Sequence, residues 1–146
     1  MAQSLGDFFN KEIRDKFTDF KIELKGILLI EIPEFLEAKG NKFAILIALS
    51  TCGKYIGLVS INTNKPFSGN YYTITQKDYS FLKYDSHVGC DFISDRPIEE
   101  IRKFLLNHPE NIKGEITDFQ HVAILQKLKA SRVITPKQKK LYGLTE

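Results

Sequence analysis

The strongest constraint on the fold comes from two apolar segments joined by only four residues. Phe43–Ser50 (FAILIALS) is continuously apolar, and Tyr55–Asn62 (YIGLVSIN) carries several β-branched residues. Both are short for a helix, and the connection Thr51–Lys54 has the length of a hairpin turn. The two segments therefore predict an antiparallel hairpin whose first strand is buried on both faces.

Three further segments have the features of strands. They are Lys21–Ile32, Tyr71–Thr75 and His87–Ile93, and in the last of these apolar residues alternate with other residues. In the turn before the last strand, Phe81 and Leu82 are expected to fill the core. Five strands joined by short loops indicate a small barrel or a strongly bent sheet.

Helical patterns flank these strands. Apolar residues spaced by three and four between Leu5 and Phe17 predict an N-terminal helix. Behind the strands, Asp95 is expected to cap one helix, and a Thr117–Gln120 capping box predicts a second that buries one apolar face, including Phe119 and Val122. Thr135–Pro136 opens a short third helix.

The chain of 146 residues is expected to be one α+β domain. Residues 1–20 would form the N-terminal helix, residues 21–94 the strands and residues 95–146 the helical part. The longest apolar run is far shorter than the roughly 20 residues that span a bilayer, and no signal-peptide pattern is present. We therefore expect a cytoplasmic protein that does not interact with membranes.

The two cysteines, Cys52 and Cys90, are expected to be reduced. Neither belongs to a Cys-x-x-Cys pair or to a His–Cys cluster with zinc spacing, so no metal site and no cofactor are expected. The sequence also lacks the G-x-S-x-G, P-loop, dinucleotide and H-E-x-x-H motifs. Most familiar classes of enzyme are disfavoured by these observations.

The sequence Asp85-Ser86-His87 suggests acid–base chemistry. Consecutive strand residues point to opposite faces, so these three cannot bond in series as a catalytic triad does. Asp85 and His87 share a face, and the carboxylate could orient the imidazole for proton transfer near pH 7. The alternative is that Asp85 and Ser86 only fix a turn through bonds to the backbone.

Polar residues gather where the second hairpin strand ends. Ser60, Asn62, Thr63 and Asn64 lie there, and Lys42 enters the neighbouring strand. Hydroxyl, amide and ammonium groups at one end of a sheet predict an anion or phosphate site. Ordinary loop polarity is the alternative.

Two further features suggest nucleic acid. Tyr71 and Tyr72 could stack on bases, although strand aromatics also serve as core residues. A basic stretch near the C-terminus contains no acidic residue, and it predicts either a phosphate-binding face or a solvated surface. Its residues are Lys127, Lys129, Arg132, Lys137, Lys139 and Lys140.

Residues Ile74–Cys90 (ITQKDYSFLKYDSHVGC) resemble a segment that follows the central hairpin in toxins of the PemK/MazF-like group. The order of elements over residues 21–94 is also similar to that group. The resemblance implies a five-stranded SH3-like β-barrel, here preceded by one N-terminal helix and followed by two or three C-terminal helices. It also implies metal-independent cleavage of single-stranded RNA, in which the 2′-hydroxyl attacks the adjacent phosphate.

By position, Lys42 lies where the group has an arginine, and Thr63 lies where it has a threonine. The resemblance thus implies Lys42 as phosphate ligand and Thr63 as acid–base group, and we add Asp85 as orienting group and His87 as base. The chain departs from the group because no Arg-Arg-Pro follows the first loop, the Gly-Asp opening of the first strand is absent, and lysine lacks the fork of arginine.

The expected function is therefore a toxin-like or phage-defence-related endoribonuclease. The alternative is a non-catalytic interaction or nucleic-acid-binding module that keeps the barrel. The resemblance implies RNA, an antitoxin protein and a second copy of the chain as partners.

Overall fold

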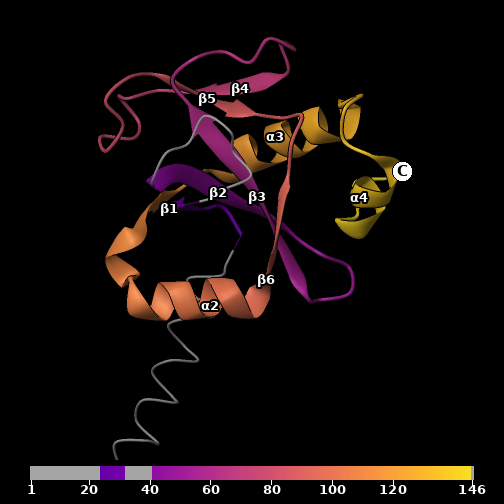
Figure 1. Ribbon diagram of the computed structural model, residues 1–146. Helices are drawn as coiled ribbons and strands as arrows, with labels where there is room; N and C mark the ends of the chain where they lie inside the picture. The colour runs from indigo at the N-terminus through magenta and orange to yellow at the C-terminus, as the bar shows by residue number, and fades with distance from the viewer. Residues whose placement is uncertain (1–23, 32–40, 146) are drawn as a thin grey trace, which may run out of the picture.

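The computed structural model describes residues 24–31 and 41–145. Within them, seven strands form one antiparallel sheet with the order β4-β5-β3-β2-β1-β7, and β6 pairs with β3 (Figure 1). The strands are β1 Gly26–Glu31, β2 Asn41–Leu49, β3 Tyr55–Asn62, β4 Tyr71–Ile74, β5 Ser86–Gly89, β6 Ser94–Pro97 and β7 Ile112–Glu115.

The predicted five-stranded SH3-like barrel is wrong. The described strands form a curled, open half-barrel in which β4 and β7 lie at the two ends of the strand order and β6 lies beside β3. Two strands were missed: β6 was assigned to the start of a helix, and β7 was not recognised. The predicted N-terminal helix lies outside the described residues, as do the start of the first predicted strand and the loop that follows it.

Strand β3 has three neighbours. Its first half, from Tyr55 to Leu58, pairs with β6, and its last two residues, Ile61 and Asn62, pair with β5. Between Ile56 and Ser60, β3 also pairs with β2, in the predicted hairpin. The sheet therefore divides at β3 into a part that leads to α2 and a part that leads to β4.

Three α-helices are described, namely α2 Ile98–Asn107, α3 Asp118–Ala130 and α4 Pro136–Leu141, together with the 3-10 turn η1 Pro109–Asn111. Helix α2 runs along the lower side of the sheet in Figure 1, and α4 lies beside the C-terminus. Since β7 lies between α2 and α3, the helical part is not separate from the sheet. None of the described helices is long and apolar enough to cross a membrane.

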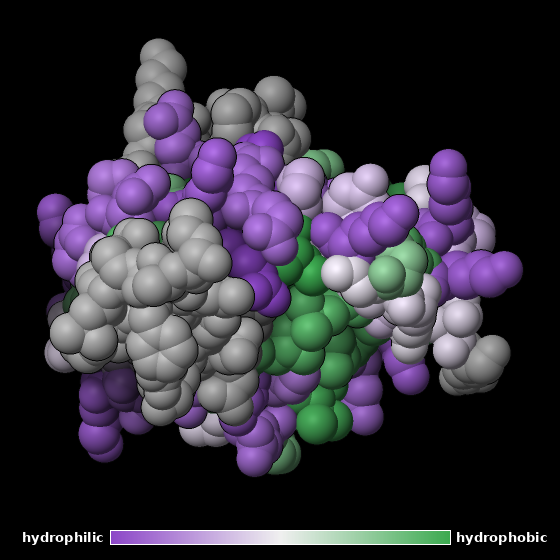
Figure 2. All heavy atoms as spheres, turned by 90° about the horizontal axis from the view of Figure 1, so that it is seen from below, coloured by the Kyte–Doolittle hydropathy of each residue, from purple (hydrophilic) through white to green (hydrophobic). Residues whose placement is uncertain are grey.

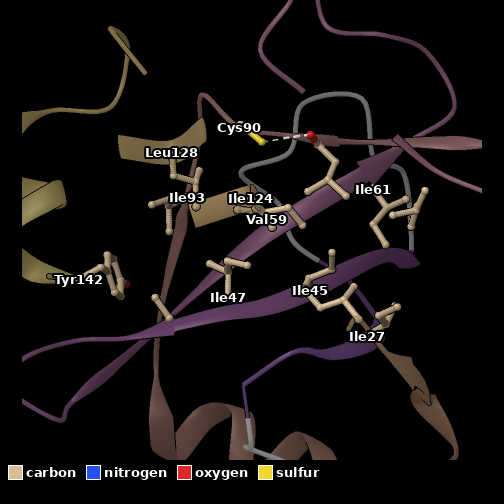
Figure 3. Packing of buried hydrophobic residues seen from close by; sticks show 14 of the residues in the cluster. Ile27, Ile45, Ile47, Val59, Ile61, Cys90, Ile93, Ile124, Leu128 and Tyr142 are labelled. Carbon is tan, nitrogen blue, oxygen red and sulfur yellow. Dashed lines mark hydrogen bonds between the residues drawn. The ribbon is translucent and has the colours of Figure 1, made fainter. Parts of the chain in front are cut away.

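Helices α2 and α3 cover opposite faces of the sheet. The apolar side chains alternate along each strand, so β2 contributes Ile45 and Ile47 to one face and Leu46 to the other. The first face packs on α3, with Ile124 and Leu128, and Figure 3 shows this cluster. The second face packs on α2, through Ile101, Leu105, Leu28, Ala44, Leu46 and Leu58.

The start of α3 was predicted correctly. The Thr117 hydroxyl accepts from the backbone N–H of Gln120 at 3.1 Å, and Gln120 Oε1 accepts from Thr117 N–H at 2.9 Å, so the capping box is confirmed. The predicted burial of Phe119 and Val122 is wrong, because their exposed fractions are 77% and 54%. Seen from below, the molecule shows a hydrophobic area with hydrophilic residues beside it (Figure 2).

Asp95 does not cap α2. The helix begins at Ile98 after Pro97, with no side-chain cap. The Asp95 carboxylate instead accepts from the hydroxyl of Tyr142 at 2.6 Å and from Gln138 Nε2 at 3.0 Å. These bonds fasten α4 and the residues after it to β6.

Candidate functional site

The sheet face that α2 covers becomes polar towards β5 and β4. Across the strands, Ala44 lies opposite Ser60, Asn62 opposite His87, and His87 opposite Thr73. Paired residues in antiparallel strands place their side chains on the same face. Beyond Ala44 this face therefore carries Ser60, Asn62, Tyr71, Thr73 and His87, which we call the polar sheet face.

His87 lies at the centre of the polar sheet face, with an exposed fraction of 9%. Its Nδ1 lies 2.9 Å from the Thr73 hydroxyl, and its ring meets the Tyr71 ring edge-on at 5.2 Å between centroids. Burial lowers the pKa of His87, the charge of Lys65 lowers it further, and Asp85 partly opposes both. The imidazole is therefore neutral near pH 7.

The tautomer of His87 determines what it can do. If Nδ1 donates its proton to the Thr73 oxygen, Nε2 carries a lone pair and can accept a proton from a ligand. If Thr73 donates to Nδ1, Nε2 becomes a donor. Because the Thr73 hydroxyl can donate or accept, this bond is compatible with His87 Nε2 acting as a base or as a hydrogen-bond donor.

A cation lies beside these rings. Lys65 is exposed, and its Nζ lies 5.6 Å from the centroid of the Tyr71 ring. Its charge also acts on His87. An aromatic ring, an imidazole and an ammonium group at one surface suit a ligand that combines planar rings with negative charge.

Amide and hydroxyl groups complete the polar sheet face. Asn62 Nδ2 donates to Ser60 Oγ at 3.1 Å. A Cβ atom on Gly89 would lie 3.7 Å from the Asn62 amide nitrogen and 3.9 Å from Ser60 Oγ. Because Gly89 has no side chain, it leaves these two groups uncovered on its side.

Of the predicted catalytic residues, Lys42 belongs to the same face. It lies opposite Ile30 of β1 and two residues before Ala44. Continuing the register of Ala44 and Ser60 by two residues places Lys42 level with Asn62, which is paired with His87. Two strand spacings, roughly 10 Å, therefore separate the backbones of Lys42 and His87.

Thr63 and Asp85 lie at the margins of the polar sheet face. Thr63 follows β3 directly and is exposed. Asp85 is exposed, and its Oδ1 accepts from the backbone N–H of Gln76 at 2.9 Å, while the Ser86 hydroxyl donates to the Tyr84 carbonyl at 2.9 Å. The turn-fixing interpretation of Asp85 and Ser86 is thus confirmed. Asp85 acts on His87 through its charge, whereas Thr73 is hydrogen-bonded to the imidazole.

The six basic residues near the C-terminus lie on α3, on α4 and between them. Helix α3 covers the face of the sheet opposite the polar sheet face. Lys139 is used within the fold, because its Nζ donates to the carbonyls of Lys129 and Ser131, both at 2.6 Å. The side chains that are exposed belong to Lys129, Arg132, Lys137 and Lys140.

A hollow lies between β2, α3 and the C-terminal residues. It has a volume of about 410 Å³ and is lined mainly by apolar side chains, including Leu49 and Leu125. His121 also lines it, with Nε2 2.8 Å from the carbonyl oxygen of Ile47. The residues that the structure describes include no group of three or more His, Cys, Asp or Glu side chains that could hold a metal ion.

Sequence reasoning identified His87 and Tyr71 but not their partners Thr73 and Lys65. Thr73 could have been found from its spacing, since it lies two residues from Tyr71 and shares its face. No protein-family model and no curated protein matches this chain.

Proposed function

We propose that the protein is a toxin-like endoribonuclease that cleaves single-stranded RNA without a metal ion, as the resemblance to the PemK/MazF-like group implies. The observation that supports it is the environment of His87. The imidazole is neutral, bonded through Nδ1 to Thr73 and flanked by Tyr71 and Lys65. A neutral imidazole held by one nitrogen is suited to take a proton with the other.

In the proposed reaction, His87 Nε2 takes the proton of a ribose 2′-hydroxyl. The 2′-oxygen attacks the adjacent phosphorus, and the bond from phosphorus to the 5′-oxygen of the next nucleotide breaks. The leaving oxygen receives a proton from an acid, a role predicted for Thr63. The products are a 2′,3′-cyclic phosphate and a 5′-hydroxyl. Lys42 and Lys65 balance the negative charge of the phosphate, and Tyr71 stacks on a base.

The test is cleavage of a labelled single-stranded RNA in the presence of EDTA, with DNA of the same sequence as a substrate that lacks the 2′-hydroxyl. His87→Gln should lower the rate by about 100-fold or more, the usual contribution of a general base. His108→Gln is the matched control, because His108 is an exposed histidine at the end of α2. Equal rates for the two variants, or equal cleavage of DNA, would contradict the proposal.

A non-catalytic RNA-binding module is the second candidate. Two observations favour it: the exposed fraction of His87 is only 9%, which restricts its contact with a 2′-hydroxyl, and the bond that positions its Nδ1 goes to a hydroxyl rather than a carboxylate. In this case the RNA binds and stays intact. Tyr71→Ala would then weaken binding, and His87→Gln would leave the RNA uncut as in the unmodified protein.

The proposed cellular role is that of a toxin or a phage-defence factor, with an antitoxin protein and a second copy of the chain as proposed partners. Induction of the protein should then arrest growth and leave cut RNA. Induction of His87→Gln at the same level should do neither. Normal growth and intact RNA after induction of the unmodified protein would contradict this role.

A further inference from the structure

The loop of residues 63–70 begins and ends at the polar sheet face. It leaves β3 after Asn62, which pairs with His87, and enters β4 at Tyr71, whose ring contacts His87. From within the loop, Lys65 reaches back over the Tyr71 ring. Any side chain presented by this loop is therefore tethered at the candidate site.

Specific bonds hold the loop in place. Asn70 Nδ2 lies within hydrogen-bond distance of the Cys90 carbonyl (3.1 Å), Asp91 Oδ1 (2.9 Å) and the Lys127 carbonyl (3.1 Å). The Asn70 carbonyl accepts from Cys90 N–H at 3.0 Å, and the Ser131 hydroxyl donates to the same Asp91 oxygen at 2.6 Å. The end of the loop is thus fixed to the two residues that follow β5 and to α3.

Phe67 stands at the tip of this loop, with a relative exposure of 110%, so its ring has no packing contact that hides it from water. Gly69 N–H donates to the Pro66 carbonyl at 3.1 Å, which makes Phe67 a central residue of a tight turn. Polar residues and glycine are the usual choices at such positions. Neither the turn nor the core therefore requires a phenylalanine here.

We propose that Phe67 is a base-stacking residue that extends the RNA-binding surface by one nucleotide beyond Tyr71. The inference rests on the proposed binding of single-stranded RNA. Its basis is the composition of the loop, in which Phe67 follows two residues after Lys65, the cation that lies over the Tyr71 ring. Aromatic rings and cations gathered on one surface bind a single strand by stacking on its bases and pairing with its phosphates.

The first experiment measures binding of a labelled single-stranded RNA to Phe67→Ala by fluorescence anisotropy. Loss of one stacked base should weaken binding by about tenfold, within the range found for alanine substitution of stacking residues. The slope of affinity against salt should stay the same, since no cation is removed. The matched control is Phe119→Ala, which removes another exposed phenylalanine ring, from α3. Equal affinity of the two variants would overturn the inference.

The second experiment uses the absence of tryptophan from the sequence. Phe67→Trp introduces a single fluorophore at the loop tip, and Phe119→Trp introduces one at the control position. Stacking on a base should quench Trp fluorescence in Phe67→Trp when single-stranded RNA is added, and not in Phe119→Trp. If vesicles of anionic phospholipid blue-shift the emission of Phe67→Trp while RNA leaves it unchanged, the loop tip is a membrane contact and the inference fails.

The two proposals fail in distinguishable ways. If the unmodified protein binds RNA and Tyr71→Ala weakens that binding, but Phe67→Ala and Phe67→Trp behave like their Phe119 controls, only the stacking role of Phe67 is overturned. If the unmodified protein neither binds nor cleaves RNA, the proposed function and the role of Phe67 both fail.

Discussion

One face of the sheet contains two regions with opposite properties. Beneath α2, the strands present Leu28, Ala44, Leu46 and Leu58 to Ile101 and Leu105, and all of these side chains are buried. On the other side of Ser60, the same face presents hydroxyl, amide, phenol and imidazole groups. The strands are continuous, so the difference lies in the side chains and in the helix placed over them.

The contrast separates stability from proposed function. The region under α2 removes apolar surface from water, which is the main source of folding free energy. The polar sheet face buries little apolar surface and so contributes little to the folding free energy. Tyr71 and Asn62 are only half-buried there. Substitutions in the first region should therefore mainly lower the free energy of unfolding. Substitutions in the second region should mainly change the proposed binding and cleavage of RNA.

The largest expected effect on stability is in the region under α2. Leu105 has an exposed fraction of 0%, and Leu105→Ala should lower the free energy of unfolding by about 2–5 kcal/mol, from lost transfer energy and the cavity left behind. Urea denaturation measures this. Leu49→Ala, at a leucine that is 42% exposed, is the control and should cost much less. Equal losses would show that the two leucines do not differ in burial as described.

A smaller effect on stability is expected when the pH changes, and it arises from His87 in the polar sheet face. The pKa of folded His87 lies below its ordinary value of 6.5 because of burial and Lys65. The unfolded chain therefore binds more protons between these two pKa values, so stability should fall as the pH drops through 6.5 towards the lower folded pKa. Urea midpoints at a series of pH values measure this slope. It should be reduced in His87→Gln, and an unchanged slope would contradict the assignment to His87.

The smallest effect is expected from Thr73→Val, which keeps the shape of the side chain and removes the hydroxyl bonded to His87. One hydrogen bond contributes about 1 kcal/mol, and partial exposure of Thr73 reduces this further. Thr63→Val, just beyond β3, is the control for stability. If Thr73 sets the tautomer of His87, Thr73→Val should also change the pH profile of RNA cleavage, and an identical profile would remove Thr73 from the site.

The elements predicted best are those with local signals. Strand β3 has the predicted limits, Tyr55–Asn62, because the turn before it is short and polar residues follow it. Helix α3 begins after Thr117, where the capping box specifies its start. The predicted core role of Leu82 is also confirmed, with an exposed fraction of 3%.

The elements missed depend on distant partners. Residues Ser94–Pro97 form β6 because they pair with the first half of β3, although Asp95 and Pro97 are local signals for the start of a helix. Strand β7 has only four residues, and pairing with β1 defines it. These two strands change the fold from the predicted five-stranded barrel to an open half-barrel of seven described strands.

The candidate site also depends on partners that are distant in the sequence, which limits its prediction. The period of two along a strand placed His87 on a defined face, but the residue opposite it depends on the register between β4 and β5. That register brings Thr73 to the imidazole. Likewise, the side of α3 that is buried, with Ile124 and Leu128, depends on how the helix lies on the sheet.

The position of Lys139 matters for chemical labelling and for charge mutagenesis. Its ammonium group is bonded to two carbonyls at the end of α3, whereas Lys137 and Lys140 on the same helix are exposed. An amine-directed reagent should therefore modify Lys137 and Lys140 before Lys139. Charge-removing substitutions that probe nucleic-acid binding should be confined to the exposed basic residues, because replacing Lys139 also removes two bonds between α4 and the end of α3.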